Sequence, residues 1–164
     1  MQMPEPTDEH HWLLQLVGDW TYESECSMGP DQPPMKSVGK QTTRPLGSLW
    51  TLGEMEHAGP DGQLHRSIFT LGFDPGKQRF VGTFVSSCMT HLWPYDGQLD
   101  AASKSLTLDS EGPSFAGDGT TSKYQDIVEI IDTDNYLLKS QVQNPDGLWT
   151  QFMLAKYSRI KATS

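Results

Sequence analysis

The stretch LHRSIFTLGFDPGKQRFVGTF, residues 64–84, decides the fold that the sequence predicts. Two segments rich in alternating apolar residues flank Asp74-Pro75-Gly76, a tripeptide typical of tight turns. This arrangement indicates two antiparallel strands joined by a hairpin. Residues that lie opposite each other in such a pair point to the same face of the sheet. The hairpin therefore places Phe69, Phe80 and Phe84 on one face, whether its loop holds two residues or four.

Similar turn signals divide the rest of the chain at intervals that are too short for helices. They are Gly59-Pro60-Asp61-Gly62, Glu111-Gly112-Pro113, Thr133-Asp134-Asn135 and Asn144-Pro145-Asp146-Gly147. The segments between the turns predict strands at about 18–27, 36–45, 48–58, 64–74, 79–88, 97–101, 105–110, 124–132, 136–143 and 148–158. A short helix is expected before them, because Trp12, Leu13, Leu16 and Val17 recur at helical spacing between Thr7 or Asp8 and Gly18.

Ten short strands linked mainly by hairpins form a meander, which rolls into a barrel or splits into a sandwich because an open sheet would leave two edges unpaired. The fold class that we expect is all-β, an antiparallel up-and-down barrel of about ten strands with a short N-terminal helix. A length of 164 residues is suited to one core, so residues 1–164 are expected to form a single β-barrel domain.

Composition narrows the range of partners and locations. The formal charge is −9, from 12 Lys+Arg against 21 Asp+Glu, which disfavours nucleic acid. No segment approaches the roughly 18 apolar residues of a membrane span, and no leader is recognisable, so a cytoplasmic protein is expected. Cys26 and Cys88 have no metal or redox spacing; two buried thiols are the favoured interpretation, with a disulfide as the alternative.

The N-terminal motif Leu16-Val17-Gly18-Asp19-Trp20, a helix running into a Gly-x-Trp, resembles the opening of lipocalin and other calycin barrels. In those barrels the Trp plugs the closed end and a basic side chain from the last strand packs across it, a position that Arg159 occupies here. Nearly the whole chain also resembles a bacterial domain-of-unknown-function family (number 1579) with this fold. The family carries no established activity to transfer. The related nitrobindins bind haem through a histidine near the C-terminus, whereas the last histidine here is His91, so no cofactor is expected.

The phase of each hairpin predicts the residues that face the interior. A two-residue turn at Pro60-Asp61 would place Trp50 opposite Leu71, Leu52 opposite Phe69, Glu54 opposite Ser67, and Glu56 opposite His65. A two-residue turn at Pro145-Asp146 would place Val142 opposite Trp149, Ser140 opposite Gln151 and Leu138 opposite Met153. A three-residue turn at Thr133-Asp134-Asn135 would add Tyr124, Asp126, Val128 and Ile130 to that face, with Glu129 opposite Lys139 outside.

These phases define the candidate ligand-binding residues, to which Trp93 is added because it lies with Tyr95 in a proline-containing connection that could close a barrel mouth. The candidates are Trp50, Leu52, Glu54, His65, Ser67, Phe69, Phe84, Trp93, Trp149 and Gln151. No metal site is expected, since alternation sends His57 and His65 to opposite faces.

Three functional hypotheses follow. In the first, a small apolar or amphipathic molecule packs on Trp50, Phe69, Phe84 and Trp149, and Glu54, Ser67 or Gln151 orients it. In the second, the barrel is a calycin-type isomerase, cyclase or decarboxylase with Glu54 or His65 as general acid or base. In the third, side chains fill the barrel, which acts through its surface or as a homodimer using Phe152 and Leu154.

Overall fold

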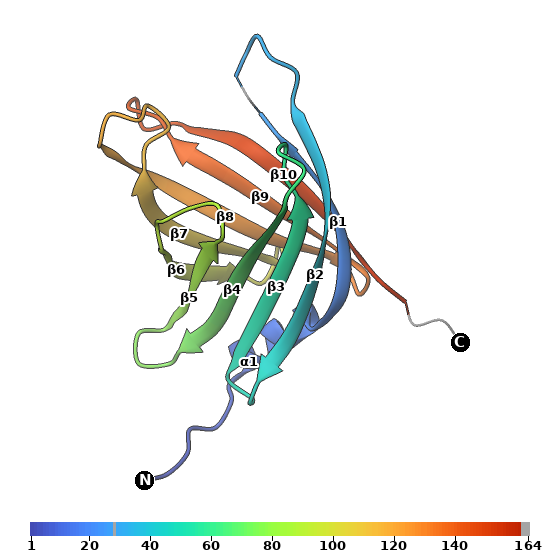
Figure 1. Cartoon of the computed structure of the whole chain (residues 1–164). Coiled ribbons are helices and arrows are strands. Elements are labelled where there is room, and N and C mark those ends of the chain that lie inside the picture. Colours follow the sequence, from blue (N-terminus) through green and yellow to red (C-terminus); the bar gives the residue numbers. More distant parts are fainter. Residues whose placement is uncertain (28, 162–164) are drawn as a thin grey trace.

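The computed structural model describes residues 1–27 and 29–161, and ten antiparallel strands close into a barrel (Figure 1). Each strand pairs with its neighbours in sequence, and the first strand also pairs with the last, which completes the ring. The strands are β1 (Gly18–Cys26), β2 (Met35–Leu46), β3 (Trp50–Ala58), β4 (Leu64–Asp74), β5 (Arg79–Ser86), β6 (Trp93–Asp100), β7 (Ser105–Pro113), β8 (Thr121–Asp132), β9 (Asn135–Gln143) and β10 (Trp149–Arg159). The predicted up-and-down barrel of about ten strands is confirmed.

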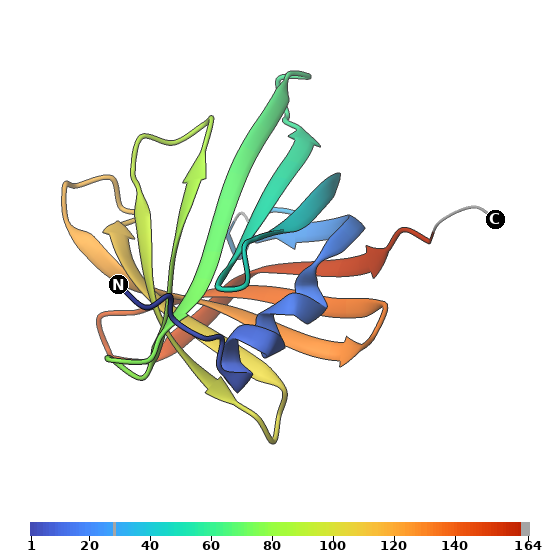
Figure 2. The ribbon, with the colours of Figure 1, turned by 90° about the horizontal axis from the view of Figure 1, so that it is seen from below.

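The N-terminal segment closes one end of the barrel, as Figure 2 shows from below. Helix α1 (Asp8–Leu13) follows Thr7 and continues into a 3₁₀ turn, η1 (Leu14–Leu16). Leu13 and Leu16 are buried against the barrel core. On the polar side, the His10 ring lies 3.0 Å from the carbonyl oxygen of Phe73 in β4. The helix is thus held to the barrel by apolar packing together with a buried polar contact.

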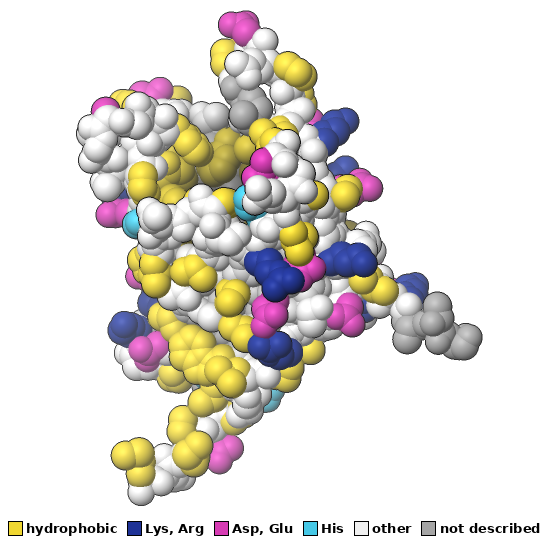
Figure 3. Space-filling model, in the orientation of Figure 1, with side chains coloured by type: hydrophobic (Ala, Val, Ile, Leu, Met, Phe, Trp, Pro, Cys, Tyr) yellow, Lys and Arg dark blue, Asp and Glu magenta, His cyan; other side chains and the backbone are white. Residues whose placement is uncertain are grey.

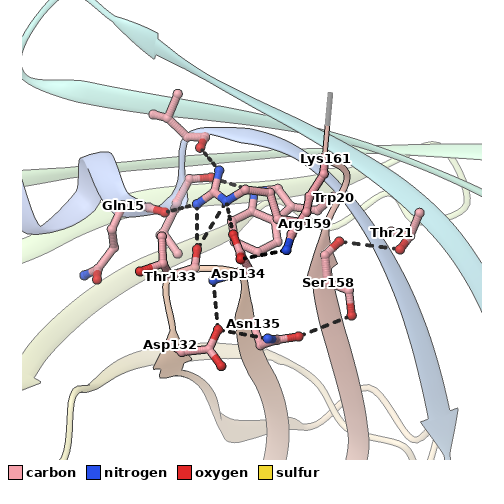
Figure 4. A network of polar contacts seen from close by, with 12 residues as sticks. Gln15, Trp20, Thr21, Asp132, Thr133, Asp134, Asn135, Ser158, Arg159 and Lys161 are labelled. Carbon is pink, nitrogen blue, oxygen red and sulfur yellow. Dashed lines mark hydrogen bonds and ion pairs between the residues drawn. The ribbon is translucent and has the colours of Figure 1, made fainter. Parts of the chain in front are cut away.

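Trp20 and Arg159 form the plug that the Gly-x-Trp motif predicts. The Trp20 ring is buried, and the guanidinium carbon of Arg159 lies 4.2 Å from its centroid. Arg159 donates hydrogen bonds to the carbonyl oxygens of Val17, Gln15 and Thr133 (Figure 4). Gly18 has φ +137°, and a Cβ there would lie 2.3 Å from Nη1 of Arg159, so only glycine leaves room for this arrangement.

The core fills the lower part of the barrel, above the helix. A run of rings crosses it: Trp20 contacts Tyr136 edge-on, Tyr136 stacks on Tyr157, and Tyr157 stacks on Tyr22. Aliphatic and aromatic side chains from the opposite wall complete the filling, namely Phe73, Phe80, Leu106, Leu108 and Val128. These side chains form one buried core in this half of the barrel.

The predicted register of the β3–β4 hairpin is wrong by one residue. Trp50 pairs with Gly72, Leu52 with Thr70 and Glu54 with Ile68, on the outer face. The loop contains three residues, Pro60-Asp61-Gly62, because Gly59 and Gln63 still pair through a backbone hydrogen bond. Gly62 has φ +76°, the left-handed residue that follows a type I turn in three-residue hairpins. The additional residue moves every side chain of β3 to the other face.

The β9–β10 hairpin repeats this error for the same reason. Pro145-Asp146-Gly147 forms the same three-residue loop, with Gly147 at φ +85°, so Trp149 pairs with Gln143 and not with Val142. A bulge between Gln151 and Met153 then reverses the phase of β10. Gln151 therefore pairs with Gln141 on the outer face, and Met153 pairs with Ser140 on the inner face.

The β4–β5 and β8–β9 faces agree with prediction. Phe69 pairs with Phe84 and Phe73 with Phe80 on the inner face. Tyr124, Asp126, Val128 and Ile130 share the inner face of Val142, Ser140 and Leu138. Glu129 pairs with Leu137 rather than with Lys139, yet the Lys139 ammonium reaches the Glu129 carboxylate diagonally at 2.8 Å.

Two further expectations need correction. Trp93, Pro94 and Tyr95 belong to β6 and not to a connection, because the exposed Pro94 is tolerated in the strand while Trp93 and Tyr95 pair with Phe84 and Gly82. The two cysteines are free thiols, but Cys88 is exposed and Cys26 only half-buried, so the expectation of two buried thiols is wrong.

Candidate ligand-binding cavity

The upper half of the barrel encloses an open cavity of ≈ 660 Å³. Its mouth lies among the loops at the end opposite α1, where Figure 3 shows hydrophobic side chains lining a hollow. Residues from eight strands, β3 to β10, and from two upper loops form the wall. They are Met55, Phe69, Phe84, Cys88, Met89, Thr90, His91, Trp93, Tyr95, Ser110, Pro113, Ser114, Phe115, Tyr124, Asp126, Leu138, Ser140, Phe152 and Met153.

Seven aromatic residues line the cavity. On one side, the Phe69 ring stacks on Tyr95 at 5.3 Å and meets Phe84 edge-on at 5.4 Å. On the other side, Phe152 packs edge-on against Phe115 and Tyr124, with centroids 5.1 and 6.1 Å away. Rings in these orientations give a wall that is rigid and apolar, and such a wall suits an apolar guest.

A carboxyl group, Asp126 of β8, lies in this apolar wall. The hydroxyl of Tyr95 donates a hydrogen bond to Oδ2 of Asp126, and the hydroxyl of Ser140 donates to Oδ1 at 2.5 Å. Burial raises the pKa of Asp126 because the ionised form loses hydration, and the two hydroxyl donors oppose that rise. Burial and the neighbouring Asp126 raise the pKa of Tyr95 well above its ordinary range, so Tyr95 stays a donor.

Trp93 lies between the cavity and β7. Its ring rests over Gly112, where a Cβ would come within 2.2 Å of the indole, so this glycine makes room for it. His91 meets the Trp93 ring edge-on at 4.6 Å, and its Nε2 lies 2.9 Å from the carbonyl oxygen of Glu111. Among the described side chains, Nε1 of Trp93 is a buried donor without a hydrogen-bond partner. The indole therefore serves the wall as an apolar surface.

A family of proteins of unknown function, DUF1579, matches residues 5–159. The chain belongs to this family. None of the curated proteins matches the chain at a significant level.

Solved structures with the same fold include Rv2717c from M. tuberculosis, with a TM-score of 0.62 and 14% identity over 96% of this chain and 100% of that one. The S-type phycobiliprotein lyase CPES from Guillardia theta has a TM-score of 0.62 and 10% identity, over 97% of this chain and 96% of that one. At these identities the likeness shows a common barrel fold. In residues 1–27 and 29–161, no helix combines the length and the apolar character needed to cross a membrane.

The structure brings three of the predicted site residues together at the cavity, namely Phe69, Phe84 and Trp93. Ser67 is buried on the inner face, where its hydroxyl donates to Ser86 at 3.0 Å, but it does not line the cavity. His65 lies near the upper tip of β4, with Nε2 3.2 Å from a carboxylate oxygen of Asp61. Because the hairpin loop has three residues, His65 pairs with His57 on one face, and the prediction of opposite faces is wrong.

The other five predicted residues lie outside the cavity. Trp50 and Leu52 begin β3 at the closed end, on its outer face, and Trp50 is 40% exposed over Gly72. Glu54 forms an exposed ion pair with Arg44, whose Nη2 lies 2.7 Å from its carboxylate. Trp149 and Gln151 lie on the exposed side of β10 before the bulge.

The candidate set lacked the polar cluster of Asp126, Tyr95 and Ser140. A signal for two of its members was present, because the β8–β9 phase already grouped Asp126 and Ser140 on the face of Leu138. The sequence predicts Tyr95 only as a mouth residue, because its neighbour Pro94 is typical of a loop. The cluster therefore depends on a side-chain contact between β6 and β8, across the intervening β7, that local patterns do not reveal.

Proposed function

We propose that this protein binds a small apolar or amphipathic molecule inside the barrel. The observation that supports the proposal is the ≈ 660 Å³ cavity, which is lined mainly by rings and aliphatic side chains and contains one hydrogen-bonded polar cluster. Pockets that hold small molecules typically have volumes of about 300–1,000 Å³ and combine an apolar wall with few polar groups.

A barrel filled by its own side chains fits the observations less well. In the half near α1, the rings of Trp20, Tyr136 and Tyr157 pack against one another in the core. The half near the mouth keeps its space, although seven aromatic residues line it. Space of this kind beside a packed core favours a binding role.

The proposal is tested by filling the cavity with one side chain. Leu138 of β9 lines the cavity, whereas its neighbour Leu137 is only half-buried and lies on the outer face of the same strand. We expect the wild type to bind Nile red, a neutral apolar dye, with a rise in dye fluorescence. Leu138→Trp should weaken that binding at least about tenfold, because the indole occupies the space of the guest.

Leu137→Trp is the matched control and should bind the dye as the wild type does. Circular dichroism of both variants establishes that they are folded. Failure of the wild type to bind the dye, or equal binding by the Leu138→Trp variant, would contradict an interior site.

Glu54 is paired with Arg44 on the outer face, and neither Glu54 nor His65 lines the cavity. The enzyme hypothesis, which named these two residues as general acid or base, is therefore less favoured.

A cytoplasmic location and a homodimer remain proposals. Phe152 turns into the cavity wall, so a dimer surface on β10 would depend on Leu154, and light scattering measures the oligomeric state directly.

A further inference from the structure

In the part of the chain that the structure describes, the cavity wall contains an acidic side chain but no lysine or arginine. Among the described residues that line it, Asp126 is the sole carboxyl group. His91 is the one basic side chain among these described lining residues, and its Nε2 is engaged with the carbonyl oxygen of Glu111. An anionic guest would therefore meet no fixed cation at the wall, whereas a cationic guest would meet a carboxylate.

The hydrogen bonds of Asp126 leave part of its acceptor capacity open. A carboxylate accepts about four hydrogen bonds, and Asp126 receives one each from Tyr95 and Ser140. None of the ion pairs among the described residues includes Asp126. Since Asp126 lines the cavity, its remaining lone pairs can meet a guest. A buried carboxylate without a counter-ion is costly, and a bound cation relieves that cost.

The surroundings of Asp126 suit a cationic group as well. The Tyr95 ring, whose hydroxyl donates to Asp126, is stacked with Phe69. Tyr124 lies two residues before Asp126 on β8. Aromatic faces attract cations that have lost water. The formal charge of −9 also raises the local concentration of cations around the whole molecule.

We propose that the cavity selects an amphipathic molecule with a protonated amine, and that the Asp126 carboxylate is the counter-ion of this amine. The inference rests on the proposed binding function and specifies its ligand class. The apolar part of the molecule lies against Phe69, Phe84 and Phe152, and its ammonium group donates hydrogen bonds to Asp126. Tyr95 and Ser140 are positioning residues that hold the carboxylate toward the cavity.

Three probes of nearly equal shape test this selection by isothermal titration calorimetry at neutral pH: 2-naphthylmethylamine, 2-naphthylmethanol and 2-naphthoate. They carry a cationic, a neutral and an anionic group on the same ring system. We expect the amine to bind at least about tenfold more tightly than the alcohol, and the carboxylate most weakly, because hydrogen bonds to charged groups are the stronger ones. Equal affinities of amine and alcohol would overturn the inference.

Asp126→Asn should reduce the amine-to-alcohol affinity ratio to about one and leave alcohol binding within about threefold of wild type, since the amide keeps the shape of the side chain. Glu111→Gln is the control, because it removes the same charge from an exposed position on β7 near the mouth. If the Glu111 variant loses the preference for the amine, or if the Asp126 variant keeps it, the preference arises from the net negative charge of the whole protein and not from Asp126.

The two proposals fail in different ways. If Nile red and 2-naphthylmethanol bind and the amine shows no preference, the interior site stands and the role of Asp126 is rejected. If none of the four probes binds, the proposed function itself is rejected. If Asp126→Asn does not fold, the ranking of the three probes on the wild type still decides the selection of an amine.

Discussion

The indoles of Trp20 and Trp93 differ in what their N–H groups meet. Nε1 of Trp20 donates to the carbonyl oxygen of Leu16 at 2.9 Å, and its ring is almost completely buried below Arg159. Nε1 of Trp93 is buried and has no partner among the described atoms. A buried donor without a partner costs free energy, so Trp93 contributes packing at a cost that Trp20 does not carry.

Replacing each indole by phenylalanine should separate these effects. We expect Trp20→Phe to lower the free energy of unfolding by about 3 kcal/mol, because it leaves a cavity and an unpaired carbonyl of Leu16. Trp93→Phe should change it by less than about 1 kcal/mol, because removal of the unpaired donor offsets the lost packing. Urea unfolding measures both. A larger loss for Trp93 than for Trp20 would contradict this account.

Asp126 should make stability depend on pH. Burial raises the pKa of Asp126 in the folded protein above the ordinary 3.8. At pH values between 3.8 and the folded pKa, the folded protein therefore holds a proton on Asp126 that the unfolded chain has released. The contribution of the protonated Asp126 to the free energy of unfolding is complete below about pH 4, and it is lost as the pH rises through the folded pKa. The Asp126→Asn variant has no carboxyl group at this position and therefore does not lose this contribution. Its free energy of unfolding, relative to that of the wild type, should be higher at pH 7 than at pH 4.

Urea unfolding at the two pH values measures this difference. Glu111→Gln, at an exposed carboxyl group, is the control. An identical pH dependence in the wild type and in the Asp126 variant would show that the folded barrel does not perturb this carboxyl group.

At the scale of elements, two hairpin loops share one chemistry. Pro60-Asp61-Gly62 and Pro145-Asp146-Gly147 each place Pro-Asp in a turn and glycine at positive φ. In each loop an Asp side chain accepts from the backbone N–H two residues ahead, at 2.9 Å, from Gln63 and Leu148 respectively. The glycine is the third loop residue, and it decides which face of β3 and of early β10 turns inward.

At the scale of the whole molecule, the end of the last strand ties the closed end together. Arg159 of β10 bonds to carbonyl oxygens in the N-terminal segment, at Gln15 and Val17, and in the β8–β9 turn, at Thr133. Its contact with Trp20 adds a cation over an aromatic ring. Segments that are more than 100 residues apart in the chain are thus joined through one side chain.

Arg159→Lys should lower the free energy of unfolding by about 2–4 kcal/mol, because the ammonium cannot reproduce the planar set of hydrogen bonds. Lys161→Ala, at an exposed position, is the control and should change it by less than about 0.5 kcal/mol. Thermal or urea unfolding measures both. Equal effects of the two substitutions would mean that Arg159 is merely a surface charge.

Alternation, turn residues and the Gly-x-Trp motif were enough to predict the barrel, because strands and hairpins form from residues that are close together in the chain. The inner faces of β4, β5, β8 and β9 followed as well. The outward turn of Trp50, Glu54 and Trp149 did not, since one loop residue or one bulge reverses a face. The cavity and the contact of Tyr95 with Asp126 were decided by the tertiary structure alone, because side chains of β6 and β8 meet inside the barrel, across the intervening β7, around space that no local pattern specifies.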